Sequence, residues 1–190
     1  MKKNLFLGFI AILNIALLSW IIKPHTSEVS FKNYLDQKPQ EYMKQAFVSI
    51  YSEEGTLKNE LSSQYWAYLP REKISRLIKP YLKIYKKDGS TWLINALKGK
   101  ALQPTIGTIE QLELQQEVVI ERPQTITLYP LKLETSQITY EPKTEIAKTD
   151  QFITMTKPGL KVTGFGMRAY LNHGSVELLQ DVKTFYTTTQ

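Results

Sequence analysis

Clustered carboxylates are the side chains in this sequence that could support acid–base chemistry. Glu110, Glu113 and Glu117 lie close together in the chain, and positioned carboxyl groups can serve as general acid and base. They stand in a segment of β character among other polar side chains, where a solvated strand surface is the simpler interpretation. We therefore assign these glutamates no catalytic role.

Other motifs of catalysis and ligand binding do not occur in the sequence. No GxSxG elbow, HExxH helix, P-loop or GxGxxG follows a strand. The stretch 162–166, VTGFG, lacks a third glycine and a following helix, and its glycines are typical of a bulge or bend in a strand. The chain has no cysteine, and its two histidines, His25 and His173, are far apart. The sequence predicts a protein that is not an enzyme and holds neither a metal nor a cofactor.

A basic stretch, 71–87, could bind an anionic partner. Its one acid, Glu72, stands against the cations Arg71, Lys73, Arg76, Lys79, Lys83, Lys86 and Lys87. Nucleic acid is one conceivable partner, and anionic lipid headgroups or lipid phosphates are another. Lysines that protect an edge strand from aggregation explain the pattern equally well. The choice between the two partners depends on the compartment in which the chain places this stretch.

Residues 5–22 predict a retained membrane-spanning helix. The run has no charged side chain, and at ~1.5 Å per residue a helix of this length crosses a ~30 Å hydrocarbon core. Trp20 and Lys23 suit the membrane interface, and no A-x-A pattern follows, so we favour an anchor over a cleaved signal peptide. The early lysines predict a cytoplasmic start, 1–4, with the remaining chain across the membrane. Lipid is then the more natural anionic partner.

The stretch 76–85, RLIKPYLKIY, alternates between apolar and polar side chains with period two. This alternation predicts one half-buried strand with Ile78, Leu82 and Ile84 on the same face. Pro80 has no N–H group to donate to a neighbouring strand. We therefore expect this strand to lie at a sheet edge or to carry a bulge.

Turn signals separate this strand from further short segments of β character. Glycine, which permits positive φ, occurs in the turn sequences 53–55 (EEG), 87–89 (KDG), 157–159 (KPG) and 172–174 (NHG). Many short strands with regularly spaced turns favour an antiparallel sandwich, roll or barrel-like sheet. It forms one domain, 46–190, after a polar linker, 23–45. A faint repeat relates 114–118 (LQQEV) to 178–182 (LLQDV) and suggests stacked strand pairs.

Apolar side chains alternate along several of these segments. The sets are Val48 and Ile50; Leu61 and Tyr65; Ile78, Leu82 and Ile84; and Leu112, Leu114, Val118 and Ile120. Alternation of this kind normally closes a hydrophobic core. In a roll whose two sheets splay apart, the same side chains could line a groove for acyl chains. The pattern alone leaves both interpretations open.

Three stretches of the chain, together with its layout, carry a family resemblance. They are 46–70 (AFVSIYSEEGTLKNELSSQYWAYLP), 76–102 (RLIKPYLKIYKKDGSTWLINALKGKAL) and 157–186 (KPGLKVTGFGMRAYLNHGSVELLQDVKTFY). With the lysine start, the apolar span and the single β domain, they resemble the LptC family of the lipopolysaccharide export system over nearly the full chain. The chain departs from the family at Gln116 and Gln180, where the Leu-x-Gly-x-Val repeat has glycine.

This resemblance implies an all-β fold, an open antiparallel β-jellyroll of the OstA-like kind, behind one N-terminal transmembrane helix. It implies a single-pass protein of the bacterial inner membrane with its main domain in the periplasm. The implied function is a non-enzymatic relay that accepts lipopolysaccharide from an ABC transporter complex of LptB, LptF and LptG. The lipid would pass to the periplasmic bridge protein LptA through rolls stacked edge to edge.

The resemblance also implies sets of site residues in this chain. The groove for acyl chains would comprise Val48, Ile50, Leu61, Tyr65, Leu77, Ile78, Leu82, Ile84, Leu93, Leu112, Leu114, Val118, Ile120, Leu133, Ile138, Leu160 and Val162. The transporter interface would comprise Ala46, Phe47, Val48 and Gly55, and the bridge-protein interface Gly159, Val176, Leu178, Val182 and Phe185. The alternative is a membrane-tethered scaffold that assembles the complex without carrying lipid. A third class, an anchored hydrolase, is disfavoured by the missing motifs.

Overall fold

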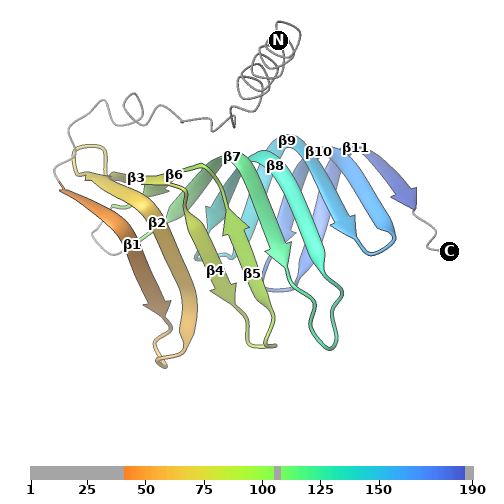
Figure 1. Cartoon of the computed structure of the whole chain (residues 1–190), viewed down its shortest axis with the longest axis horizontal. Helices are drawn as coiled ribbons and strands as arrows, with labels where there is room; N and C mark the ends of the chain where they lie inside the picture. Colours follow the sequence, from red (N-terminus) through yellow and green to blue (C-terminus); the bar gives the residue numbers. More distant parts are fainter. Residues whose placement is uncertain (1–40, 105–107, 187–190) are drawn as a thin grey trace, which may run out of the picture. The chain divides into compact units, whose positions relative to one another are not determined.

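The structure, a computed structural model, describes residues 41–104 and 108–186. Its antiparallel strands are β1 (Glu41–Tyr51), β2 (Leu57–Leu69), β3 (Ile74–Ile78), β4 (Tyr81–Tyr85), β5 (Thr91–Asn95), β6 (Lys98–Leu102), β7 (Gln111–Arg122), β8 (Leu131–Glu141), β9 (Ile146–Lys157), β10 (Leu160–Tyr170) and β11 (Ser175–Tyr186). They form one 11-stranded sheet (Figure 1). Within these ranges, no helix is long and apolar enough to cross a membrane. The predicted anchor, 5–22, lies outside the described residues.

The sheet is a meander folded into two facing layers (Figure 1). Layer I contains β4 and β5, and layer II contains β3 and β6. The long strands β2 and β7 belong to both layers: β2 pairs with β4 through 59–62 and with β3 through 65–69. Likewise β7 pairs with β5 through 119–121 and with β6 through 111–115. In effect β3 with β4, and β5 with β6, are the two halves of bent strands. Strands β8 to β11 continue both halves of β7 through successive antiparallel pairing, so the turns 142–145 and 171–174 lie at the tips of layer II.

The bends follow one line across the sheet, where residues leave the ordinary β conformation. Positive φ angles occur there at Gln45 in β1 (51°), Gln116 in β7 (65°), Gly166 in β10 (72°) and Asp181 in β11 (50°). The strand register also shifts beside the last three of these residues. A residue in the left-handed region bends a strand and increases its twist, so these bulges fold the sheet upon itself.

Hydrogen bonds replace the strand ladder at the bend line. The backbone N–H of Leu97 donates to the Gln116 carbonyl at 3.0 Å, and that of Lys79 donates to the Leu97 carbonyl at 2.9 Å. The buried Ser63 hydroxyl donates to the Ile78 carbonyl at 2.8 Å and accepts from the Ile78 N–H at 3.2 Å. Buried backbone groups that leave a ladder need such partners, so the bend is internally satisfied.

Side chains that face inward from both layers form one hydrophobic core. It includes Trp92 and Ile94 from layer I and Trp66, Leu77 and Leu114 from layer II. Because strand side chains alternate, every second residue of each half-strand contributes. The bend line therefore closes one side of the core, and the strand tips meet at the opposite side, which we call the mouth.

The prediction of one strand over 76–85 is wrong. The chain forms β3 and β4, separated at Lys79 and Pro80, and neither strand lies at an edge. Lys79 has a φ of 48°, and Pro80 fixes its own φ and lacks an N–H, so the alternation restarts after them. As a result Ile78 pairs with Tyr65 and lies outside the core cluster, whereas Leu82 is within it.

The structure bears on two further predictions, the turn sequences and the start of the β domain. Glycines 55, 89, 159 and 174 all have positive φ in turns, which confirms the predicted turn sequences. The predicted domain start at residue 46 is late, because β1 begins at Glu41 and pairs there with Tyr68. Polar side chains led us to assign 41–45 to the linker, whereas backbone pairing with β2 makes them a strand.

We predict that Gln116→Gly stabilises the fold by about 0.5–1 kcal/mol. A non-glycine residue in the left-handed region costs roughly 1–2 kcal/mol, of which the greater freedom of glycine in the unfolded chain offsets about 0.4–1 kcal/mol. The Gln116 side chain is exposed, and the bond that its carbonyl accepts from Leu97 is kept. The midpoint of urea unfolding of the purified chain measures the effect.

The control is Gly166→Ala, which should lower the same midpoint. Its φ is 72°, and an added Cβ would lie 3.1 Å from Leu179 Cδ1. A decrease for Gln116→Gly as well would contradict the view that the bend is strained at Gln116.

Candidate functional site

Most of the side chains predicted to form a groove lie inside the roll. The core cluster contains Leu61, Leu77, Leu82, Ile84, Leu112, Leu114, Val118, Ile120, Leu133 and Ile138, each at most 4% exposed. Val48 is partly buried and packs against this cluster. The layers thus enclose a continuous apolar interior whose side chains contact one another.

The remaining predicted groove residues lie elsewhere. Tyr65 stacks on Tyr42 with ring centroids 5.6 Å apart, and the Tyr42 side chain is exposed. Leu93 stands between the buried Trp92 and Ile94, so it faces away from the interior, opposite Lys83 in the register. Ile50 borders a cavity that is described below. Leu160 and Val162 lie at the start of β10, and neither belongs to the core cluster.

A cavity of about 540 Å³ opens at the mouth of the roll. It is lined by Ile50, Tyr51, Ser52, Glu53, Glu54, Lys58, Asn59, Leu61, Leu82, Thr108, Ile109, Leu112, Tyr140, Pro142 and Lys143. Tyr140 is 1% exposed, and within the described part of the chain its buried hydroxyl has no hydrogen-bond partner. Burial, helped by the nearby charge of Glu145, raises the pKa of Tyr140, so the hydroxyl stays protonated. It can donate a hydrogen bond to an oxygen atom of a bound molecule.

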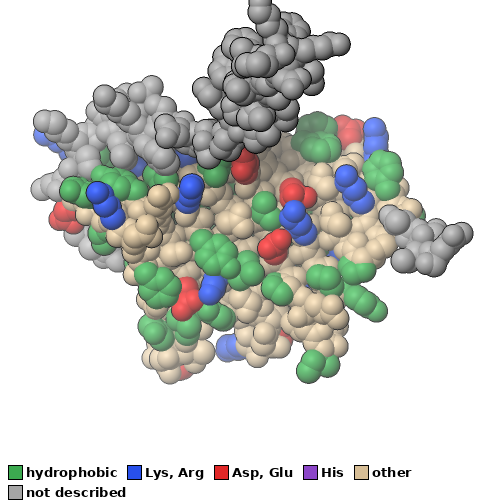
Figure 2. All heavy atoms as spheres, viewed as in Figure 1, with side chains coloured by type: hydrophobic (Ala, Val, Ile, Leu, Met, Phe, Trp, Pro, Cys, Tyr) green, Lys and Arg blue, Asp and Glu red, His purple; other side chains and the backbone are tan. Residues whose placement is uncertain are grey.

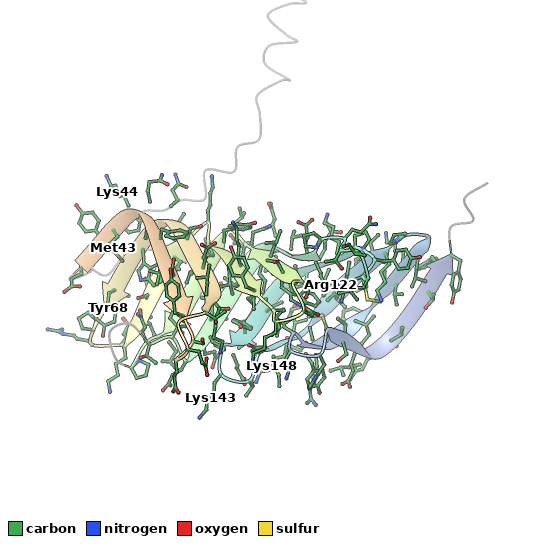
Figure 3. The ribbon with its side chains drawn as sticks, turned by 90° about the horizontal axis from the view of Figure 1, so that it is seen from below. Met43, Lys44, Tyr68, Arg122, Lys143 and Lys148 are labelled. Atoms are coloured by element: carbon green, nitrogen blue, oxygen red, sulfur yellow. The ribbon has the colours of Figure 1, made fainter. Side chains whose placement is uncertain are left out.

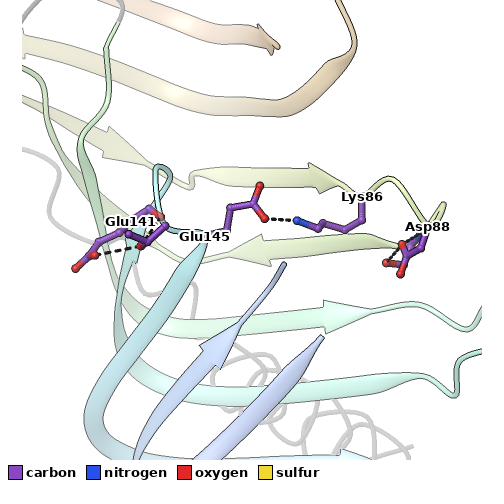
Figure 4. Close-up of polar contacts among 6 residues, drawn as sticks. Lys86, Asp88, Glu141 and Glu145 are labelled. Carbon is purple, nitrogen blue, oxygen red and sulfur yellow. Dashed lines mark hydrogen bonds and ion pairs between the residues drawn. The ribbon is translucent and has the colours of Figure 1, made fainter. Parts of the chain in front are cut away.

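Polar contacts cross the mouth from one layer to the other. The Lys86 ammonium, which follows β4, forms an ion pair with the Glu145 carboxylate, which precedes β9 (Figure 4). Only 12% and 20% of these side chains are exposed. Arg122, at the tip of β7 (Figure 3), donates from Nη1 to the Gly174 carbonyl at 3.4 Å. These contacts hold the strand tips of the two layers together.

A second ion pair on the same hairpin does not cross the mouth. Lys148 Nζ lies 2.5 Å from Glu141 Oε1, and both residues belong to the paired strands β8 and β9. The hydrogen bond from Lys148 lowers the pKa of the Glu141 carboxyl. Both lysines of this hairpin, Lys143 and Lys148, are labelled in Figure 3.

The predicted interface residues lie on or beside the two edge strands. Among the described residues, β1 pairs only with β2, and β11 pairs only with β10. On β1, Phe47 is 62% exposed whereas Ala46 is buried, and Gly55 is in the following turn. On β11, Val182 and Phe185 are about half exposed, and Val176 and Leu178 pack against the core. Gly159 is in the turn before β10.

Hydrophobic side chains are exposed near both edges of the sheet (Figure 2). Near the C-terminal edge, the rings of Phe152 and Phe165 contact edge to face, with centroids 5.2 Å apart. A hollow of about 830 Å³ is lined by these rings together with Lys161, Thr163, Asp181, Val182, Lys183 and Phe185. An unpaired strand beside exposed apolar side chains can accept a further strand.

Arg122 and Tyr140 are not among the residues that the sequence predicts for the site. Both continue an apolar alternation: Arg122 follows Val118 and Ile120, and Tyr140 follows Ile138. The two-residue alternation of inward side chains could have identified both positions as inward-facing. Their polar character instead suggests exposed positions. No group of His, Cys, Asp and Glu suited to a metal ion occurs among the described residues.

The family described as "Lipopolysaccharide-assembly, LptC-related" matches residues 8–187. Comparison with curated proteins finds no match. The chain is similar to the crystal structure of LptH, the LptA-homologous periplasmic component of the lipopolysaccharide transport device of Pseudomonas aeruginosa. The TM-score is 0.54 at 6% identity, over 68% of this chain and 95% of LptH, which supports the fold alone.

The family match extends over nearly the whole chain, and the folded antiparallel sheet agrees with the fold of an LptA homologue. The chain belongs to the LptC-related family of lipopolysaccharide-assembly proteins.

Proposed function

We propose that this chain carries lipopolysaccharide between its two layers and passes it from an inner-membrane transporter of LptB, LptF and LptG to the bridge protein LptA. Membership of the LptC-related family supports a role in lipopolysaccharide transport. The observation that carries the finer proposal is a continuous apolar interior that ends at an unpaired strand on each side. Such an interior can take up acyl chains, and such edges can join further rolls.

Acyl chains can enter only if the layers move apart at the mouth. The interior side chains fill the space between the layers, and the cavity beside Leu61 and Leu82 is where the interior approaches solvent. Each CH₂ group that leaves water contributes ~0.8 kcal/mol at full burial. When the layers separate, apolar side chains become exposed to water. Acyl chains between the layers would cover these side chains again.

The edge strands give the relay its direction in this proposal. β1 would add to the transporter and β11 to the bridge protein, through backbone hydrogen bonds between neighbouring rolls. The apolar segment 5–22 would anchor the chain in the inner membrane and place the sheet in the periplasm. No catalytic step is part of this function.

One observation favours the alternative, a scaffold that carries no lipid. The residues at the centre of the interior, such as Leu114 and Ile120, are not exposed at all. A scaffold needs edge strands, which β1 and β11 provide, and a stable core, which this closed interior provides. Lipid crosslinking distinguishes the two functions.

We predict that a photocrosslinking residue at Leu82 forms adducts with lipopolysaccharide in Gram-negative cells. Leu82 faces the interior and borders the mouth cavity. The matched control is Leu93, an apolar residue on the neighbouring strand that faces outward. Adducts at Leu82 but not at Leu93, detected by gel shift and anti-lipopolysaccharide blot, would support the relay. A chain that assembles with its transporter but forms no adduct at either position would exclude it.

We predict that Glu145→Gln accelerates lipid uptake. The substitution keeps the shape of the side chain but removes the ion pair with Lys86 that crosses the mouth. A loss of about 1 kcal/mol would raise the open population roughly fivefold. The initial rate of adduct formation at Leu82 measures this change.

The control for this substitution is Glu141→Gln. It removes a pair with Lys148 that joins neighbouring strands of one layer. Its uptake rate should equal that of the unmodified chain. Equal rates for both variants would show that the Lys86–Glu145 pair does not limit access.

A further inference from the structure

Arg122 is a buried cation at the mouth, and no carboxylate of the described residues forms an ion pair with it. Its side chain is 8% exposed. Its Cζ atom lies 5.4 Å from the centroid of the Trp92 ring. A guanidinium presents five N–H donors and has no acceptor atom, so only acceptors can satisfy it.

The hydrogen bonds of Arg122 leave part of the guanidinium unused. Nη1 donates to the Gly174 carbonyl at 3.4 Å and Nη2 to the Tyr129 carbonyl at 3.3 Å, both long for such bonds. The buried Nε–H group has no hydrogen-bond partner among the residues 41–104 and 108–186. Buried charges in native proteins are normally paired, so this arrangement calls for an anion.

A cleft of about 480 Å³ lies beside Arg122, between the turns that follow β7 and β9. Its lining comprises Glu121, Arg122, Pro123, Pro130, Leu131, Lys132, Thr156, Lys157 and Pro158. Lys132 is paired with Glu134 at 2.8 Å, whereas Lys157 forms none of the ion pairs among the described residues. Apolar walls lower the local dielectric and strengthen the field of the two remaining cations.

We propose that Arg122 and Lys157 bind a phosphate group in this cleft. The planar fork of arginine matches phosphate oxygens in a bidentate manner, and lysine adds a point charge. Glu121 precedes Arg122 on β7, and because successive strand side chains alternate, its carboxylate lies on the opposite face of the strand from the buried guanidinium. The Trp92 ring beneath the guanidinium keeps the fork in place.

The location suggests which phosphate would bind, and this step rests on the proposed function. If acyl chains lie between the layers, the phosphorylated sugars that bear them stay at the mouth. Arg122 is at the tip of β7 and contacts Gly174 of the opposite layer, so it lies at that level. The shared chemistry is a phosphate, whose source is a lipid headgroup or the free anion.

Titration of the purified full chain with inorganic phosphate, at an ionic strength held constant with chloride, tests the site. We expect a saturable rise in the unfolding temperature and a change in tryptophan fluorescence, since Trp92 contacts Arg122. Arg122→Met should abolish both responses, and Lys157→Ala should weaken the apparent affinity roughly tenfold. Arg168→Met, which removes an exposed arginine, is the matched control and should leave both intact.

The proposed phosphate site is wrong if the unmodified chain shows neither response. It is also wrong if the Arg122→Met chain responds as the unmodified chain does. If Arg122→Met does not fold, Lys157→Ala decides, because Lys157 ends its strand at a turn. An unchanged affinity for that variant would also overturn the proposal.

A second titration compares a phosphorylated lipid with its dephosphorylated form bearing the same acyl chains. Tighter binding of the phosphorylated lipid, lost in Arg122→Met, identifies a headgroup as the source. A response to inorganic phosphate without discrimination between the lipids identifies the free anion. If neither lipid binds, the proposed lipid-carrying function is rejected. The titration with inorganic phosphate then still tests the phosphate site by itself. Equal binding of both lipids without any phosphate response rejects the site but keeps lipid carriage.

Discussion

The bend line is the constraint on which the rest of this structure depends. Left-handed residues or breaks in the pairing occur at the same level in several neighbouring strands, and this alignment lets the two layers face each other. Positive φ at Gln45, Gln116 and Asp181 shows that the chain accepts left-handed backbone there without glycine. Such residues cost free energy, which the apolar core enclosed by the bend offsets. The fold is therefore set by where the strands break as much as by how they pair.

Bending also determines what lies at the mouth. Strand tips of both layers meet there, and turns carry polar side chains because their backbone groups need water or side-chain partners. The layers are consequently joined by Lys86 with Glu145 and by Arg122 with the Gly174 carbonyl, while apolar contacts fill the space behind. Contacts of this kind are weaker than core packing. Separation of the layers should thus begin at the mouth, with the bend line as hinge.

Local chemistry explains which features the sequence predicted. The turn at Gly89 follows from a residue type that favours positive φ, and the inward position of Leu114 follows from alternation. The break at Lys79 was missed because lysine carries no such preference, and its conformation is imposed by the bend of neighbouring strands. In the repeat of 114–118 and 178–182, the matching residues Glu117 and Asp181 are both left-handed, with φ of 51° and 50°, although neither is of a type that the sequence marks for a bend. The alternation of apolar side chains likewise shows which residues face inward, but it does not show whether they pack against one another or line a groove.

Core and groove need not exclude each other in this architecture. Separating the layers exposes side chains such as Leu82 and Leu112, and acyl chains between the layers would bury them again. Both processes scale with apolar area at ~25 cal/mol per Å², so the exchange of side-chain contacts for lipid contacts is close to balanced. A near-balanced exchange gives modest affinity in either direction. That property suits a protein that receives a lipid and then releases it, and it requires no chemical step.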